Sequence, residues 1–224
     1  MIQVIIADDH PALRRGLKGI LAEESDMGIV AEAASGNELL DKLHKTACDV
    51  VLLDISMPGR GGLDVLSDLR RQYPRTPVLV LSVYPEEQFG SRVLKAGAAG
   101  YLNKQAASDQ LINAVRKVCA GGKYVSPSLA EKIAGDLSTD THLPPHETLS
   151  DREYQIFCMI ASGKTVSEIA RELCLSQKTI STHRSRILDK MQLRTNAQLT
   201  FYAIQNHLIE SCPFPNGEAK TMSP

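Results

Sequence analysis

The sequence contains no tryptophan, and aromatic residues make up only 4% of its 224 residues. An aromatic platform for stacking single-stranded nucleic acid bases is therefore not expected. No apolar stretch approaches the ~20 residues that a membrane-spanning helix needs. The N-terminal residues MIQVIIADD also lack the basic start and the apolar segment of a signal peptide. We therefore expect no membrane association.

Cysteines are few and are not arranged as a framework. The chain has five of them, an odd number, with no CxxC pair and no cluster of cysteine with histidine. A disulfide scaffold and a zinc site are both disfavoured by this pattern. Reduced thiols in a cytoplasmic protein are the simpler interpretation.

The chain also has almost no net charge: it contains 25 basic and 26 acidic residues, and its formal charge is −1. This balance excludes a positive field over the whole molecule, but it does not exclude a local one. Residues 178–194 contain five basic residues and a single acidic one. The positive field is therefore concentrated in one short segment.

Residues 1–123 alternate short apolar runs with helical patterns. Runs that are apolar at consecutive positions are typical of strands buried on both faces. Five βα units predict an α/β fold with a doubly wound, five-stranded parallel sheet. The predicted strands are Ile2–Ala7, Gly28–Ala33, Asp49–Asp54, Pro77–Ser82 and Ala99–Leu102.

The remainder of the chain changes character. Proline, serine and threonine in residues 124–147 predict a linker, which includes a possible short helix over Ser128–Leu137. Residues 148–210 have a purely helical pattern and predict a small all-α domain, with Ser150, Ser176 and Thr195 as helix N-caps. Residues 211–224 contain three prolines and predict a flexible tail.

Polar side chains stand where the predicted strands end. Asp8 and Asp9 follow the first strand, Asp54 closes the third, Ser82 closes the fourth and Lys104 follows the fifth. Ligands of parallel α/β sheets bind outside these carboxyl ends. Three adjacent carboxylates repel one another unless a cation is present, and Mg²⁺ prefers oxygen ligands. The lysine and the hydroxyl would donate hydrogen bonds to an anion held beside the metal. This set of side chains is suited to the transfer of a phosphoryl group to a carboxylate.

Four motifs in residues 1–123 carry a family resemblance: ADDH, VVLLDISMPGRGG, LVLS and GAAGYLNK. In this order and spacing they resemble the receiver domain of bacterial two-component response regulators, which has a flavodoxin-like fold. The resemblance implies that Asp54 accepts a phosphoryl group from a sensor histidine kinase. It also implies that Mg²⁺ is bound by the Asp9 and Asp54 carboxylates and the Ser56 carbonyl, with Asp8 acting through metal-bound water.

The same resemblance assigns three further roles. Lys104 would pair with the phosphoryl group, Ser82 would move its hydroxyl toward it, and Tyr101 would act as an aromatic switch. Two positions depart from the common pattern. Many members of the family have threonine at the position of Ser82. Many also have proline after the lysine, whereas Gln105 follows Lys104 here.

The positively charged segment has the pattern of a helix–turn–helix. Apolar residues recur on one face of each helix, which leaves a polar and basic face outside. A helix fits the major groove of DNA, where polar side chains reach bases and cations hold phosphates. The alternative for a basic helix is a solvated charged face. The outer residues are Lys178, Ser181, Thr182, Arg184, Ser185 and Arg186.

The segments LSDREYQIFCMIASGKTVSEIA and LSQKTISTHRSRILDKM resemble LuxR-type (NarL/FixJ) DNA-binding domains over residues 149–208. The resemblance implies that the last helix, Thr195–His207, forms a homodimer contact on DNA. Many members of this family have lysine at the position of Ser181. The serine removes that long donor from the groove, which leaves the base preference open. The resemblance places Ser181, Thr182 and Ser185 toward bases, and Lys178, Thr179, Arg184, Arg186 and Lys190 toward phosphates.

Together these patterns predict a cytoplasmic response regulator that binds double-stranded promoter DNA and is not an enzyme beyond its own phosphorylation and dephosphorylation at Asp54. One alternative is a phosphorylation-independent DNA-binding regulator that uses the receiver as a dimerisation scaffold. Another is a Mg²⁺-dependent aspartyl phosphatase. It is disfavoured because the residue two positions after Asp54 is Ser56, not a second carboxylate.

Overall fold

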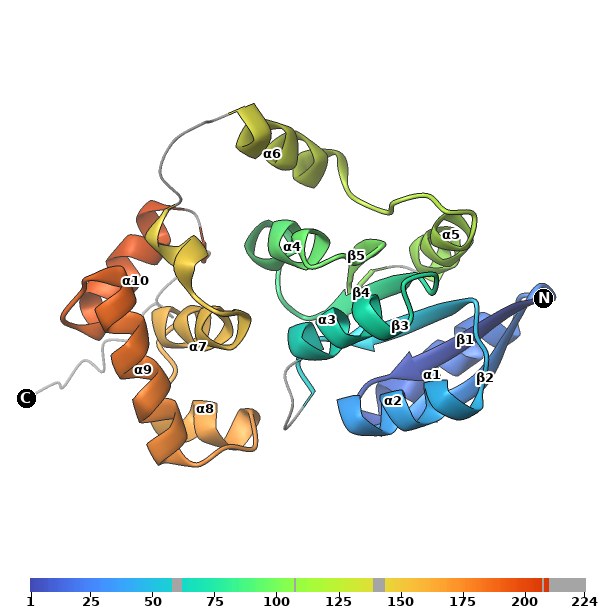
Figure 1. The fold of residues 1–224 in the computed structure, drawn as a ribbon, viewed down its shortest axis with the longest axis horizontal. Helices are drawn as coiled ribbons and strands as arrows, with labels where there is room; N and C mark the ends of the chain where they lie inside the picture. Colours follow the sequence, from blue (N-terminus) through green and yellow to red (C-terminus); the bar gives the residue numbers. More distant parts are fainter. Residues whose placement is uncertain (58–61, 107, 139–143, 207, 210–224) are drawn as a thin grey trace, which may run out of the picture.

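A five-stranded parallel sheet forms the N-terminal part of the computed structural model (Figure 1). The structure describes residues 1–57, 62–106, 108–138, 144–206 and 208–209. The strand order is β2-β1-β3-β4-β5, and every neighbouring pair is parallel. The predicted sheet is confirmed, with each strand end within one residue of expectation. The strands are β1 (Ile2–Ala7), β2 (Met27–Ala33), β3 (Val50–Asp54), β4 (Val78–Ser82) and β5 (Gly100–Asn103).

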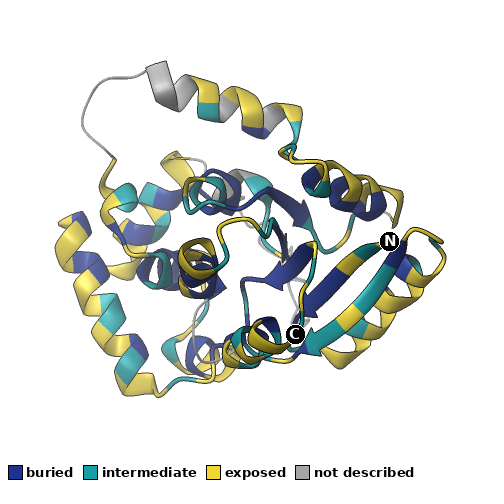
Figure 2. Ribbon diagram, turned by 45° about the vertical axis from the view of Figure 1, so that its right-hand side comes forward, coloured by how far each residue is buried: buried dark blue, intermediate teal, exposed yellow. Residues whose placement is uncertain are grey.

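Helices cover both faces of the sheet, because side chains alternate across each strand. Val50 and Leu52 pack with residues of α1 and α5, whereas Val51 and Leu53 pack with residues of α2, α3 and α4. All four are fully buried, and Figure 2 shows the central strands in dark blue while the edge strand β2 is partly exposed. The helices are α1 (Pro11–Ala22), α2 (Gly36–Lys45), α3 (Gly62–Gln72), α4 (Glu86–Lys95) and α5 (Ser108–Cys119).

The segment after α5 returns to the sheet before it leaves the N-terminal domain. Tyr124 forms a parallel bridge with Gly100, and α6 (Pro127–Ser138) then contacts α4. Leu129 of α6 is 3% exposed, and it lies against Gly90 of α4, where a Cβ would come within 2.6 Å of the leucine. The short helix expected in the linker therefore packs on the N-terminal domain.

The C-terminal part is entirely helical in its described residues. It contains η1 (Pro145–Thr148), α7 (Asp151–Ala161), α8 (Val166–Glu172), α9 (Gln177–Met191) and α10 (Asn196–Gln205). Capping boxes at Ser150, Thr165 and Thr195 satisfy the free backbone N–H groups at three helix starts, and the Ser176 hydroxyl caps α9. The capping box at Thr165 was not predicted, although the sequence TVSE carries its signal.

Helices α8 and α9 form the predicted helix–turn–helix. Cys174 adopts a left-handed conformation with φ of 50° in the turn between them. Ile169, Ile180 and Ile187 are fully buried and join the two helices to the core of α7 and α10. Among the described helices, none has the length and apolarity to cross a membrane. The predicted tail, residues 211–224, lies outside the described residues.

Two valines give a matched test of the packing. Val51 in β3 is 0% exposed, whereas Val30 in the edge strand β2 is 37% exposed. Val51→Ala is expected to lower the free energy of unfolding by about 2 kcal/mol, because it removes two buried methyl groups and leaves a cavity. Val30→Ala removes the same two methyl groups, but it is expected to lower the free energy of unfolding by less than half as much. Urea denaturation followed by circular dichroism checks this, and equal losses would contradict the assigned burial.

Candidate functional site

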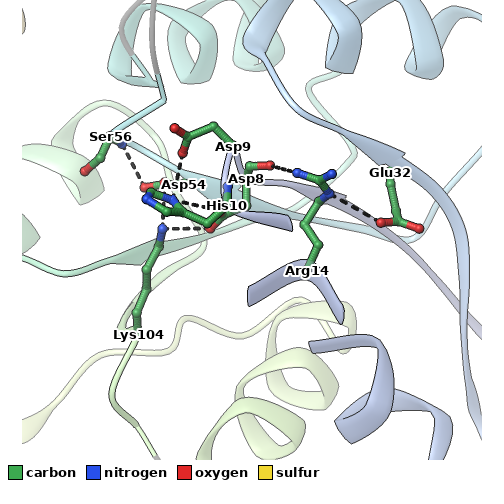
Figure 3. A network of polar contacts seen from close by, with 8 residues as sticks. All are labelled: Asp8, Asp9, His10, Arg14, Glu32, Asp54, Ser56 and Lys104. Carbon is green, nitrogen blue, oxygen red and sulfur yellow. Dashed lines mark hydrogen bonds and ion pairs between the residues drawn. The ribbon is translucent and has the colours of Figure 1, made fainter. Parts of the chain in front are cut away.

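Three carboxylates meet at the carboxyl ends of β1 and β3, where the sheet changes its winding direction (Figure 3). One ligand atom each from Asp8, Asp9, His10 and Asp54 lies within 4.8 Å of the others. Asp8 and Asp54 are each 1% exposed, and Asp9 is partly exposed. The sequence predicted that the three carboxylates gather here, but it did not include His10.

Lys104 supplies a positive charge to this cluster. Its Nζ lies 2.7 Å from Asp8 Oδ2 and 2.6 Å from Asp54 Oδ2, and its side chain is only 7% exposed. Burial raises the pKa of Asp54, although Lys104 partly opposes this effect. Burial acts to lower the pKa of Lys104, but its interactions with Asp54 and Asp8 outweigh burial and raise that pKa. Lys104 is therefore held as a cation between two buried acids.

Backbone and helix groups fix the two buried carboxylates. The Ser56 backbone N–H donates to Asp54 Oδ1 at 2.8 Å, and the His10 backbone N–H donates to Asp8 Oδ1 at 2.7 Å. Arg14, in the first turns of α1, donates to the Asp8 carbonyl at 2.6 Å and pairs with Glu32 at 3.3 Å (Figure 3). Neither Arg14 nor Glu32 was predicted, because only the tertiary structure brings them together.

The donor set fits a hard divalent cation. Carboxylate oxygens are the ligands that Mg²⁺ prefers, and three carboxylates exceed the charge that one ammonium group can neutralise. His10 Nδ1 lies 2.9 Å from Asp9 Oδ1, and the imidazole side chain is 65% exposed. The residues that could hold the cation are therefore Asp8, Asp9 and Asp54, with Ser56 beside them.

Ser82 and Tyr101 meet through a residue that the sequence did not single out. The Tyr84 backbone N–H donates to Ser82 Oγ at 3.1 Å, and the Tyr101 hydroxyl donates to the Tyr84 carbonyl at 2.7 Å. Ser82 is fully buried and Tyr101 is 2% exposed. The Lys104 backbone N–H also donates to the Ser82 carbonyl at 2.8 Å. Lys104, Ser82, Tyr84 and Tyr101 therefore form a continuous polar path away from the acids.

The predicted outer face of α9 is accessible. Thr179 and Arg184 are partly exposed, and the other predicted residues of this face are exposed: Lys178, Ser181, Thr182, Ser185, Arg186 and Lys190. The Thr182 and Ser185 hydroxyls donate to carbonyls one turn earlier in α9, which leaves their oxygens as acceptors. Polar and basic groups thus line the helix where a DNA groove would lie.

Two of the predicted cations of α9 already have partners. Lys190 donates to Glu153 of α7 at 2.6 Å. Burial alone would raise the pKa of Glu153, but its bonds with Lys190 and Ser150 outweigh burial and lower it. Arg184 Nε donates to Asn196 Oδ1 at 2.6 Å, and the sequence did not predict this partner at the start of α10. Lys190 therefore joins two helices, and Arg184 is held from α10.

The structure divides the apolar residues of α10, which the sequence could not do. Leu199 and Ala203 are fully buried in the domain core. Phe201 and Ile204 are 69% and 43% exposed, one turn apart on the outer side. The outer pair is therefore available for contact with another surface.

Comparison with known proteins matches both parts of the chain. Residues 4–116 match the family described as the response regulator receiver domain, and residues 147–203 match bacterial regulatory proteins of the luxR family. The response regulator GacA of Pseudomonas aeruginosa is 37% identical over 212 residues, which cover 94% of this chain and 99% of that protein. The response regulator UvrY of Escherichia coli K12 is 36% identical over 209 residues, covering 93% and 96%.

Solved structures agree with these matches. The RcsB response regulator of Salmonella typhimurium is similar with a TM-score of 0.66 and 29% identity, over 91% of this chain and 97% of that one. RcsB bound to the promoter rprA in the presence of the phosphomimetic BeF₃⁻ is similar with a TM-score of 0.63 and 28% identity, over 90% and 97%. The chain belongs to the response regulators that join a receiver to a LuxR-type DNA-binding domain, the NarL/FixJ family.

Removal of the positive charge of Lys104 tests the electrostatics of the site. Lys104→Met is expected to lower the free energy of unfolding by about 3–5 kcal/mol in EDTA, because it leaves two buried carboxylates without their partner. Added Mg²⁺ is expected to restore part of the loss in urea denaturation. The control is Lys42→Met, whose exposed pair with Glu38 spans 3.9 Å and should contribute below about 0.5 kcal/mol. An equal effect of both substitutions would contradict the assignment.

Proposed function

We propose that this response regulator is controlled by phosphorylation of Asp54, with a sensor histidine kinase as the phosphodonor and promoter DNA as the output partner. The observation that carries the proposal is the buried group of Asp8, Asp54 and Lys104 at the carboxyl edge of the sheet. The receiver match at residues 4–116 and the luxR match at 147–203 support a receiver at 1–123, a linker at 124–147 and a DNA-binding domain at 148–210.

In the proposed reaction an Asp54 carboxylate oxygen attacks the phosphorus of a phosphohistidine. The new O–P bond forms as the P–N bond breaks. The electron pair of the P–N bond stays with the imidazole nitrogen of the histidine. Lys104 holds the ammonium that would neutralise charge on the phosphoryl oxygens. A Mg²⁺ ion held by Asp8, Asp9 and Asp54, with the Ser56 carbonyl, would supply further charge neutralisation at phosphorus. The protein is then its own substrate and performs no turnover on other molecules.

The response to phosphorylation is proposed to pass through Ser82 and Tyr101. A phosphoryl group adds ~1.5–2 negative charges and new acceptor oxygens. Ser82 ends β4 with a buried hydroxyl, which accepts from the Tyr84 backbone N–H. A turn of Ser82 toward the phosphoryl group would remove that acceptor and allow the loop before α4, and Tyr101 with it, to shift.

The output is proposed to be a homodimer on promoter DNA. The exposed groups Ser181, Thr182 and Ser185 are assigned to bases, and Lys178, Thr179, Arg184, Arg186 and Lys190 to phosphates. Phe201 and Ile204 of α10 supply an exposed apolar pair for the contact between protomers. A symmetric dimer would place two α9 helices on two half-sites.

Phosphorylation can be measured directly by intact mass spectrometry after incubation with Mg²⁺ and either acetyl phosphate or phosphoramidate. The wild type is expected to gain one phosphoryl group, and Asp54→Ala is expected to gain none while keeping its circular dichroism spectrum. Asp64→Ala, at an exposed position of α3, is the matched control and should be labelled like the wild type. Labelling of Asp54→Ala to the level of the wild type would reject Asp54 as the phosphoacceptor. No labelling of the wild type by either donor would favour a receiver that serves only as a dimerisation scaffold.

DNA binding gives an independent test. Arg186→Ala is expected to weaken binding to duplex DNA and to reduce the slope of log K against log salt by about one, because it removes one phosphate contact. Arg75→Ala changes the same charge on an exposed part of the receiver and should leave the slope unchanged. Fluorescence anisotropy at several salt concentrations measures both. A slope that falls equally in the two variants would reject α9 as the DNA-binding helix.

A further inference from the structure

Asn103, the last residue of β5, closes the turn that carries Lys104. Its side-chain Oδ1 accepts a hydrogen bond from the Gln105 backbone N–H at 2.8 Å, and its carbonyl accepts from the Ala106 backbone N–H at 2.9 Å. Both bonds span Lys104, which therefore lies inside the two rings that they close. Asn103 itself is fixed by the sheet, because it pairs with Ser82 in the register of β4 and β5.

The main chain of Lys104 is also held from the side of the sheet. Its backbone N–H donates to the Ser82 carbonyl at 2.8 Å, while its Nζ lies 2.7 Å from Asp8 Oδ2 and 2.6 Å from Asp54 Oδ2. A lysine side chain loses much rotamer freedom when its ammonium is fixed. A main chain that is already in place limits the further ordering that this requires. The position of Nζ is therefore expected to depend on the turn that Asn103 closes.

The glutamine at position 105 explains why this turn needs a side-chain acceptor. Many receivers have proline after the lysine, and proline fixes its own φ and has no backbone N–H. Gln105 has no such ring, and its N–H needs an acceptor. An asparagine side chain commonly bonds to the backbone two residues further on, which is where Gln105 stands relative to Asn103. Asn103 therefore supplies the restraint that a proline would build into the backbone.

The hydrogen bond of Asn103 Oδ1 lies at the surface and is not part of the core. Gln105 is exposed and Asn103 is partly exposed, so water can take the place of a lost acceptor. Loss of this oxygen is therefore expected to loosen the turn without unfolding the domain. Since the oxygen is engaged by the backbone of Gln105, it acts on the acidic site through Lys104.

We propose that Asn103 is a positioning residue for phosphoryl transfer, because its side-chain oxygen closes the turn around Lys104 and so holds the ammonium against the two buried acids. The inference rests on the proposed function of Asp54 for the rate of phosphorylation, but not for the position of Lys104. Without the acceptor, the ammonium occupies more positions and meets the phosphoryl oxygens less often. Cation binding should not weaken, since Asp9 follows β1 and Asp54 ends β3.

The test uses the full chain with three substitutions that leave its charge unchanged. Asn103→Ala removes the acceptor, and Asn103→Ser keeps a weaker one, because serine hydroxyls form the same kind of turn less strongly. Asn113→Ala is the matched control at an exposed position of α5. Circular dichroism confirms that each variant is folded, and Asn103→Ser replaces Asn103→Ala if the latter does not fold.

The position of Lys104 is measured first, in the absence of any phosphodonor. The Lys104 side chain is 7% exposed and its ammonium is paired with two carboxylates, so its proton–nitrogen resonance should be observable by nuclear magnetic resonance. Its absence from Lys104→Met assigns it. The resonance is expected to broaden or vanish in Asn103→Ala, to be intermediate in Asn103→Ser, and to be unchanged in Asn113→Ala. An unchanged resonance in Asn103→Ala, or none in the wild type, would overturn the proposal.

Phosphorylation and cation binding are measured next. With acetyl phosphate or phosphoramidate at saturating Mg²⁺, Asn103→Ala is expected to react on the order of ten-fold more slowly, and Asn103→Ser less than about three-fold more slowly. The Mg²⁺ affinity, from isothermal titration, is expected to stay within about two-fold of the wild type, because its carboxylate ligands are unchanged. An equal loss of rate and of Mg²⁺ affinity would indicate a general disturbance of the site and would overturn the positioning role.

Failure of this inference and failure of the proposed function give different results. If the wild type is phosphorylated and Asn103→Ala reacts at the same rate, the positioning role fails and the assignment of Asp54 stands. If the wild type is not phosphorylated by either donor, the assignment of Asp54 fails. The Lys104 resonance then still decides whether Asn103 holds the ammonium in place.

Discussion

The ion pairs of Lys104 with Asp8 and Asp54 are the interaction on which the receiver depends. Two carboxylates that are 1% exposed repel each other in a region of low dielectric, and a single ammonium within 2.7 Å of both compensates for that repulsion. The pairs therefore fix the carboxyl ends of β1, β3 and β5 relative to one another. Asp9 adds a third carboxylate, which one ammonium cannot neutralise, and this excess of negative charge is what the proposed Mg²⁺ site requires.

Satisfaction of buried polar groups extends this constraint toward the second domain. Ser82 and Tyr101 are buried hydroxyl residues that each need a partner, and both find it on the backbone of Tyr84. The ring of Tyr84 in turn stacks on Phe89 of α4, and Phe89 meets Tyr154 of α7 edge to face. Tyr84 therefore lies between the polar path that begins at Lys104 and the packing of α7 on the receiver.

Within the C-terminal domain, helix packing divides the tasks. The isoleucines of α8 and α9 are buried against α7 and α10, and this burial points the polar and basic side chains of α9 outward. α7 presents its other side to the receiver through Tyr154 and Gln155. The surface proposed to bind DNA and the surface that packs on the receiver therefore lie on different helices of this domain.

The sequence by itself determined the parallel sheet, the helix–turn–helix and the acids and lysine at the strand ends, because strand periodicity, capping boxes and strand-end positions are local signals. It did not reveal Arg14 with Glu32, Arg184 with Asn196, or Tyr84 as the partner of Ser82 and Tyr101. It also left the apolar residues of α10 undivided between core and surface. The docking of Arg92 on residues 54 to 59 positions away was likewise decided only by the tertiary structure. A single long side chain on an amphipathic helix carries no mark of its partner, since that partner is chosen by how whole domains pack.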